Sequence, residues 1–292
     1  MHATLLLVQL LFAGFAVVGK AVLAEMPPLV LAALRVAGAT PLLLLMAWRR
    51  DRILPRRSDL PMLAVLGLLG VTANQVLFVF GLERTTATNA SILMPSIPVF
   101  AVAIGGLLGL DRPGPAQLGG VALSIVGALV LLDPRRMAEA PGTAVGNALI
   151  LGNCLSYALF LVLQRPLLQR LPWRTVIAWA FLFGSAGVLP LAAPQLAAFS
   201  FAALSPPVWL GAAYVVLLAT VLGYALNTWA VRRSSPSLVA AYTCAQPLFA
   251  AGLAFAFLGE RLGWRELLGF AFIAGGLALA GATRAARDAT TA

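Results

Sequence analysis

Histidine, cysteine and charged side chains are all scarce in this sequence of 292 residues. The only histidine is His2, and the two cysteines, Cys154 and Cys244, lie inside apolar segments. A metal site built from His and Cys ligands is therefore nearly excluded, and no glycine-rich phosphate loop follows a strand pattern, so we expect neither a metal nor a cofactor. Only 10% of the residues are charged, against about 25% in soluble domains, which excludes an ordinary soluble protein.

Apolar residues are correspondingly frequent and make up 61% of the chain. They form repeated runs of about 20 residues, each long enough to cross about 30 Å of hydrocarbon. We read the first run as a membrane helix rather than a signal peptide, because no clear small-residue cleavage site follows it. The sequence predicts an all-α polytopic membrane protein with ten transmembrane helices, at roughly 3–24, 28–48, 60–82, 87–109, 114–133, 143–164, 174–193, 206–230, 236–259 and 263–283.

The net charge of +10 is distributed as a membrane topology predicts rather than as a nucleic-acid patch. With a cytoplasmic N-terminus, thirteen arginines fall on the inner side: Arg49, Arg50, Arg52, Arg56, Arg57, Arg112, Arg165, Arg170, Arg174, Arg232, Arg233, Arg284 and Arg287. Five fall on the outer side: Arg84, Arg135, Arg136, Arg261 and Arg265. We therefore expect both termini in the cytoplasm, a lipid bilayer as the surrounding partner, and no nucleic-acid partner.

Two distant stretches of the chain have similar sequences. A shift of 149 residues aligns 84–131 with 233–280 without a gap and gives ten identities over 48 positions. Apolar composition alone does not easily match Pro, Gly and Arg together, as in Pro98 with Pro247, Gly127 with Gly276 and Arg112 with Arg261.

That shift spans five predicted helices, and five is an odd number, so equivalent helices must cross the membrane in opposite directions. We therefore expect two inverted five-helix repeats around a central cavity, an arrangement of many secondary transporters, whose substrate site lies near the midplane between the halves.

The residues of this repeat resemble a known family. The ending "LGERLGWRELLGFAFIAGGLALAG", Leu258 to Gly281, is similar to the terminal signature of the EamA family in the drug/metabolite transporter superfamily, and "GKAVLAEMPPLVLAALRVAGATPLLLL" resembles its first repeat. The resemblance implies repeats over 1–138 and 139–292, a bacterial inner membrane, and within the family an exporter of aromatic or other bulky neutral amino acids. The chain departs from the family in having "FAGF", Phe12 to Phe15, where "WGSN" is frequent, which suggests an aromatic, less polar entrance.

Polar side chains inside the spans are the candidate substrate contacts, because such groups are costly in lipid and usually pair or face a cavity. Amide and aromatic residues share helix stripes at spacings of three and four. Amides can bind a zwitterion, and aromatics supply apolar walls. Interhelical hydrogen bonding is the alternative for each one, and interfacial snorkelling is the alternative for Lys20. The predicted lining is Lys20, Asn74, Phe78, Asn153, Tyr157, Tyr224, Asn227, Tyr242 and Gln246.

Four further residues are predicted to act in structure or gating. Arg35 is expected to bond between helices or to carbonyls. Pro95, Pro98 and Pro247 each lack a backbone donor, so they kink helices, either as gates that free carbonyls towards a substrate path or as static packing features.

The acidic residues all fall at span ends, in loops or in the tail, whereas proton-coupled carriers usually keep one inside a span. We therefore expect gradient-driven export of a small molecule by alternating access. Open alternatives are a proton-coupled drug or organic-cation exporter, and a channel or scramblase on the same scaffold. An enzyme is not expected, because a buried acid pair, a catalytic dyad and metal ligands are all missing. The oligomeric state stays open between monomer and homodimer.

Overall fold

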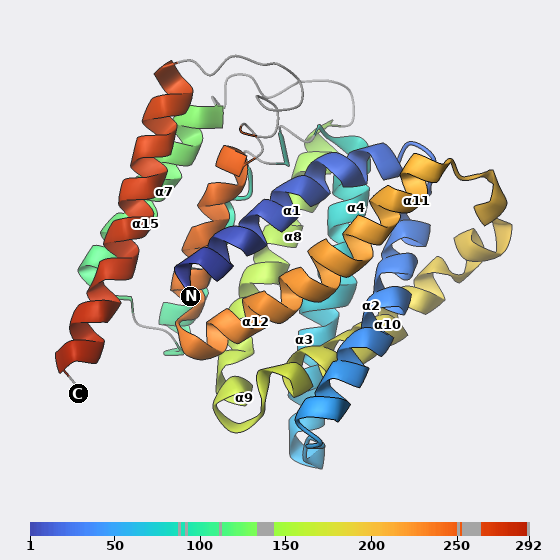
Figure 1. Cartoon of the computed structure of the whole chain (residues 1–292), viewed down its shortest axis with the longest axis horizontal. Helices are drawn as coiled ribbons and strands as arrows, with labels where there is room; N and C mark the ends of the chain where they lie inside the picture. Colours follow the sequence, from blue (N-terminus) through green and yellow to red (C-terminus); the bar gives the residue numbers. More distant parts are fainter. Residues whose placement is uncertain are drawn as a thin grey trace.

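The computed structural model describes residues 1–86, 89–90, 93–110, 113–132, 143–249, 252 and 264–290, and these contain helices and no strands (Figure 1). Six rods are long and apolar enough to cross a membrane: α1 (His2–Val22), α2 (Pro28–Arg50), Arg57–Arg84, Thr143–Arg170, α10 (Trp173–Ala198) and Pro206–Arg233. Shorter apolar helices are α6 (Ser96–Leu107), α7 (Pro115–Leu132) and the apolar part of α15 (Trp264–Thr290). These agree with a polytopic helical membrane protein.

Three of the rods are composite. Arg57–Arg84 consists of η1 (Arg57–Asp59), α3 (Leu60–Gly67), the π-helical η2 (Leu68–Ala73) and α4 (Asn74–Arg84). Pro206–Arg233 consists of α11 (Pro206–Ala213), the π-helical η5 (Tyr214–Leu222) and α12 (Gly223–Arg233). Thr143–Arg170 joins α8 (Thr143–Leu163) to α9 (Arg165–Arg170). The first two rods lie 149 residues apart at both ends, so the sequence repeat recurs as a repeated break in helical geometry.

The helices pack in reciprocal pairs (Figure 1). α1 packs on η5 and α12, and α8 packs on η2 and α4. α2 packs against α10, α7 against α15, and α6 against α13 (Pro236–Ala241). The contacts of α1 and of α8 are thus counterparts in which the two parts of the chain exchange roles, while α2 with α10 and α7 with α15 pair equivalent helices.

Glycine brings α7 and α15 into close contact at one side of the bundle (Figure 1). A Cβ atom added at Gly120 would lie 2.5 Å from the carbonyl oxygen of Gly276, and one at Gly127 would lie 2.8 Å from that of Gly269. Gly269 and Gly276 are the repeat equivalents of Gly120 and Gly127, so the two contacts are copies of each other. Small residues let membrane helices approach to backbone distance, which explains why these positions carry glycine.

We expect Gly120→Ala to destabilise the protein, by about 1–3 kcal/mol, because the new methyl group meets backbone atoms of α15. Gly119→Ala is the matched control, since its nearest neighbour would be a Leu279 methyl group at 3.8 Å. That substitution should be neutral or stabilise the helix by up to about 1 kcal/mol. Thermal unfolding in detergent measures both, and equal melting temperatures would refute the packing argument.

Two expected spans differ in detail from the structure. The span predicted at 87–109 turns at Met94–Pro95, and its long helix is α6 from Ser96; residues 87–88 and 91–92 lie outside the described part. The span predicted at 236–259 begins as α13, continues as the 3-10 helix η6 (Tyr242–Ala245), and is helical again over 246–249. Its end, the start of the terminal signature with Glu260, and the expected repeat boundary at 138/139 lie outside the described residues.

The prolines account for these breaks. Pro95 is the N-cap of α6 and Pro98 lies in its first turn, while Pro247 follows η6. At the start of a helix the missing backbone donor costs nothing, because the first N–H groups have no intrahelical partner. These prolines therefore begin helical segments instead of kinking a continuous helix, and whether they act as gates stays a prediction.

Candidate functional site

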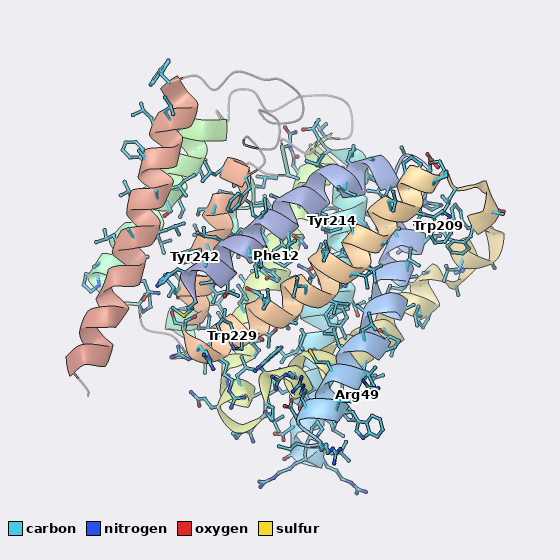
Figure 2. All side chains as sticks on the ribbon, viewed as in Figure 1. Phe12, Arg49, Trp209, Tyr214, Trp229 and Tyr242 are labelled. Carbon is cyan, nitrogen blue, oxygen red and sulfur yellow. The ribbon has the colours of Figure 1, made fainter. Side chains whose placement is uncertain are left out.

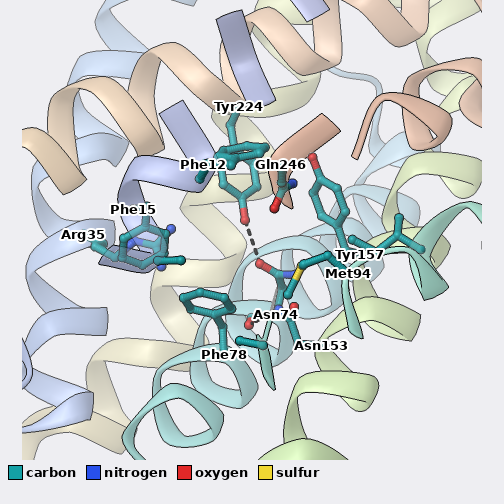
Figure 3. Close-up of a pocket in the computed structure, with 14 residues that line it drawn as sticks. Phe12, Phe15, Arg35, Asn74, Phe78, Met94, Asn153, Tyr157, Tyr224 and Gln246 are labelled. Atoms are coloured by element: carbon teal, nitrogen blue, oxygen red, sulfur yellow. Dashed lines mark hydrogen bonds between the residues drawn. The ribbon is translucent and has the colours of Figure 1, made fainter. Parts of the chain in front are cut away.

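A cavity lies in the middle of the bundle (Figure 3), and its empty space together with the open solvent at its mouth is about 650 Å³. Its walls come from both parts of the chain, chiefly α1, α4, α8 and α12. Fourteen residues line it: Phe12, Ala13, Phe15, Ala16, Arg35, Asn74, Phe78, Ala90, Met94, Ile97, Asn153, Tyr157, Tyr224 and Gln246.

Six of the nine residues predicted as lining are among them: Asn74, Phe78, Asn153, Tyr157, Tyr224 and Gln246. Asn74 is central among them because it is hydrogen-bonded to two other helices. It is also the first residue after the π segment η2. The Tyr224 hydroxyl donates to its Oδ1 over 2.7 Å (Figure 3), and the Asn153 Nδ2 donates to its carbonyl oxygen over 2.7 Å. These bonds join α12, α4 and α8 across the cavity wall.

Aromatic rings supply the apolar surface. The rings of Tyr157 and Tyr224 meet edge to face with centroids 6.2 Å apart, and Phe12 meets Tyr224 in the same way at 5.9 Å. Phe15 and Phe78 form a second pair at 4.9 Å. A ligand here would meet ring faces and edges from several helices, with the amides of Asn74, Asn153 and Gln246 between them.

Arg35 of α2 supplies the cavity's charge. Its side chain is buried, its Nε donates to the Thr220 hydroxyl of η5 over 3.0 Å, and its guanidinium carbon lies 4.2 Å from the centre of the Phe15 ring. The interhelical bond expected of Arg35 is therefore present. The same side chain also lines the cavity, which the sequence argument did not anticipate.

Three predicted lining residues lie elsewhere. The Lys20 ammonium donates to the carbonyl oxygens of Leu82 and Thr85, over 2.6 and 2.9 Å, and so caps the end of α4. Its long side chain reaches those unpaired carbonyls from α1, so it does not line the cavity. Asn227 lies behind the wall and donates to the Tyr157 hydroxyl. Tyr242 lies near the start of α1, where its hydroxyl bonds to His2 (Figure 2).

The sequence reasoning missed several apolar lining residues, among them Phe12, Phe15, Met94 and Ile97. For the two phenylalanines a signal existed, since they are the ends of the "FAGF" stretch that suggested an aromatic entrance. Met94 and Ile97 gave no signal, because an apolar residue in a membrane span is equally suited to packing against lipid.

Acidic side chains and histidine are missing from the residues that line the cavity, and Arg35 is its one ionised group in the part of the chain that the structure describes. The arrangement is suited to holding a small, largely apolar molecule by its shape and a few hydrogen bonds.

The model of the EamA-like transporter family matches residues 1–133 and again 144–282. The chain belongs to this family. An EamA-like protein is a multi-pass membrane transporter and not an enzyme, in agreement with the apolar rods and the cavity between them.

Similar proteins carry transporter names. The chain is 32% identical to an uncharacterized transporter of Archaeoglobus fulgidus, over 89% of this chain and 90% of that protein. It is 30% identical to a probable terminal-alkyne amino-acid exporter of Streptantibioticus cattleyicolor, over 70% and 68% of the two chains. It is 27% identical to a probable amino-acid metabolite efflux pump of Salmonella typhimurium, over 89% and 88%.

One solved crystal structure has the same fold, with a TM-score of 0.77 over 97% of both chains at 19% sequence identity. At that identity the likeness concerns the fold alone.

Proposed function

We propose that this EamA-family transporter exports neutral amino acids with aromatic or other bulky side chains across a bacterial inner membrane by alternating access. The observation that carries the proposal is the cavity between α1, α4, α8 and α12, whose aromatic walls are interrupted by three amides. Its lining, mostly apolar with a few polar groups, is that of a site for a small organic molecule. The names of the similar proteins from Streptantibioticus cattleyicolor and Salmonella typhimurium, an amino-acid exporter and an amino-acid metabolite efflux pump, support amino acids as the substrate class.

We further propose that the chain consists of two inverted five-helix repeats, 1–138 and 139–292. The reciprocal contacts of α2 with α10 and of α7 with α15 support this, as does the double match of the family model. A two-fold axis in the membrane plane would relate the helix pairs and place the cavity between the halves. Both termini would then lie in the cytoplasm, as the distribution of arginine predicts.

The π segments offer the two-state element that alternating access needs. η2 contains 6 residues and its counterpart η5 contains 9. A π turn holds more residues than an α turn, so a change in the length of a π segment rotates the helix that follows it. η2 and η5 end at equivalent residues of the repeat, so their different lengths would give α4 and α12 different rotations relative to the helix before them. Exchanging the two lengths would exchange the two packings.

Gln75 supports a second packing. It is the repeat equivalent of Tyr224, it is fully buried, and neither polar atom of its amide has a hydrogen-bond partner. A buried unpaired polar group costs about 1–3 kcal/mol, so a state that turns Gln75 towards the cavity would recover this energy.

The test is counterflow in proteoliposomes preloaded with unlabelled phenylalanine. We expect saturable uptake of external radiolabelled phenylalanine, competition by leucine and tryptophan, and no competition by arginine. Protein-free liposomes are the control. Uptake that does not saturate would indicate a channel, lipid flip without amino-acid exchange would indicate a scramblase, and exchange of organic cations alone would indicate a drug exporter; each result would refute the proposal.

A pH gradient separates the two energy sources. The cavity lining in the described part of the chain lacks Asp, Glu and His, so we expect counterflow at the same rate with and without an imposed gradient. Accumulation that requires the gradient would show that a proton-coupled cycle operates instead.

A further inference from the structure

We infer that Arg35 binds the carboxylate of the transported molecule, and that this carboxylate, rather than an ammonium group, is the charge that the cavity selects. The inference rests on the proposed function, because it assigns a ligand to the same cavity. It differs from the sequence-based expectation, in which Arg35 had a structural or gating role.

The surroundings of Arg35 leave its charge without a counter-charge. The side chain is 3% exposed, yet no carboxylate lies within ion-pair distance of it among the described residues. Three acids form ion pairs in the described part of the chain, and each pairs with an arginine other than Arg35. They are Asp51, Asp59 and Glu83. Besides the Thr220 hydroxyl and the Phe15 ring, the guanidinium also interacts with the Tyr224 hydroxyl, and none of these three groups carries a charge.

An uncompensated buried charge is expensive unless a partner arrives, and arginine is the side chain whose planar fork fits a carboxylate through two parallel hydrogen bonds. The bond to Thr220 uses Nε and fixes the plane of the guanidinium. The Phe15 ring fixes its face. Arg35 is therefore oriented before a ligand enters, and it belongs to the cavity wall (Figure 3).

The rest of the cavity defines the remainder of the ligand. The Phe78 ring packs against Phe15 in a tilted arrangement with centroids 4.9 Å apart, so aromatic surface begins directly beside the guanidinium. It continues across the cavity to Phe12 and Tyr224. A molecule with a carboxylate at one end and an apolar or aromatic body would place its charge at Arg35 and its body between these rings.

The cavity offers much less to an ammonium group. Acidic residues are missing from its described lining. The Asn74 side-chain oxygen already accepts from Tyr224. Neutral amide oxygens are weaker partners of a cation than a carboxylate would be. Removing the amino group from an amino acid should therefore cost little affinity, whereas removing the carboxylate should cost much.

Binding to the purified full-length protein in detergent tests this with three probes that share one ring: phenylalanine, 3-phenylpropionate and phenethylamine. By isothermal titration, we expect the two carboxylates to bind with dissociation constants within about threefold of each other, and the amine at least tenfold more weakly. This comparison uses the unaltered protein, so it does not depend on whether a variant folds. Equal binding of the amine, or no binding of either carboxylate, would overturn the inference.

Arg35→Gln and Arg35→Lys add the residue-level test. Glutamine should weaken both carboxylates at least tenfold and leave the amine unchanged or bound more tightly. Lysine should restore part of the carboxylate affinity, because it keeps the charge and loses the fork. Carboxylate binding by Arg35→Gln at the strength of the unaltered protein would refute the assignment.

The outcomes separate this inference from the proposed function. Arg35-dependent carboxylate binding without counterflow would support the site and refute the transporter proposal. Counterflow of phenylalanine that Arg35→Gln leaves intact would support the transporter and refute the role of Arg35.

Discussion

Tyr224→Ala should reduce phenylalanine counterflow at least tenfold. The ring is buried and contacts four others, with the Phe181 centroid at 5.2 Å and those of Phe12, Tyr157 and Phe160 at 5.9 to 6.3 Å. Its hydroxyl is bonded to Asn74 across the cavity. Truncation removes an aromatic wall, opens a void next to the ligand and leaves the Asn74 side-chain oxygen without this donor. Losing an aromatic core side chain costs about 3–5 kcal/mol, so reduced stability should accompany the loss of transport.

Tyr224→Phe separates the ring from the hydroxyl. It keeps the wall and removes the donor, so counterflow should fall less than for alanine, and the difference between the two variants measures the contribution of the ring. Combining Tyr224→Phe with Asn74→Ala should cost little more than Asn74→Ala alone, because one bond links the two side chains. Full additivity would show that this bond does not support transport.

Tyr214→Ala is the matched control on the same rod. Its hydroxyl donates to the Leu11 carbonyl of α1 over 2.9 Å, so it too joins two helices (Figure 2). It is not among the residues that line the cavity. We expect lower thermal stability with nearly unchanged affinity for phenylalanine. An equal loss of binding in both tyrosine variants would mean that the bundle, and not the cavity, is what Tyr224 supports.

Lys20→Met should lower the unfolding free energy by about 2 kcal/mol while leaving the ligand dissociation constant within about twofold of the unaltered protein. The ammonium donates to the carbonyl oxygens of Leu82 and Thr85 and lies 3.3 Å from that of Glu83, all at the end of α4. A cation at a helix C-terminus is favoured by the helix dipole and by the carbonyls that lack intrahelical partners. Methionine has nearly the same length and no donor, so these carbonyls lose their partner.

Lys20→Arg is the conservative variant for this cap, and it should recover most of the stability because it can reach the same carbonyls with a charged donor. Thermal unfolding in detergent measures both variants, and titration with phenylalanine measures the site. A large rise in the dissociation constant of Lys20→Met at unchanged stability would return Lys20 to the cavity, where the sequence argument placed it.

The positions of the helices and the presence of the repeat could both be predicted from the sequence. A segment in lipid must satisfy its backbone internally, so an apolar run of sufficient length is a helix. Hence the ranges expected at 28–48 and 143–164 correspond to α2 and α8 within two residues. Gly127 and Gly276 were recognised as matched positions of the repeat, and the structure shows that close backbone approach there tolerates no larger residue.

The lining of the cavity could be predicted from the sequence only in part. Asn74, Asn153 and Tyr157 could be predicted because polar groups in lipid must face one another or a cavity. The same rule cannot say which of the two, so Asn227 and Tyr242 were placed in the lining although their partners are Tyr157 and His2. Lys20 was misplaced because a long flexible side chain reaches atoms far from its own Cα, and the carbonyls that hold it belong to another helix.

By itself, then, the amino-acid sequence determined a helical membrane protein with a 149-residue repeat, because hydrophobic run length and matched Pro, Gly and Arg are properties of the chain alone. Only the tertiary structure decided where the π segments fall, which side chains enclose the cavity, and that Arg35 faces it without a carboxylate partner among the described residues. Those features depend on which residues of distant helices meet, and a rotation of one helix by a fraction of a turn changes them while leaving every apolar run intact.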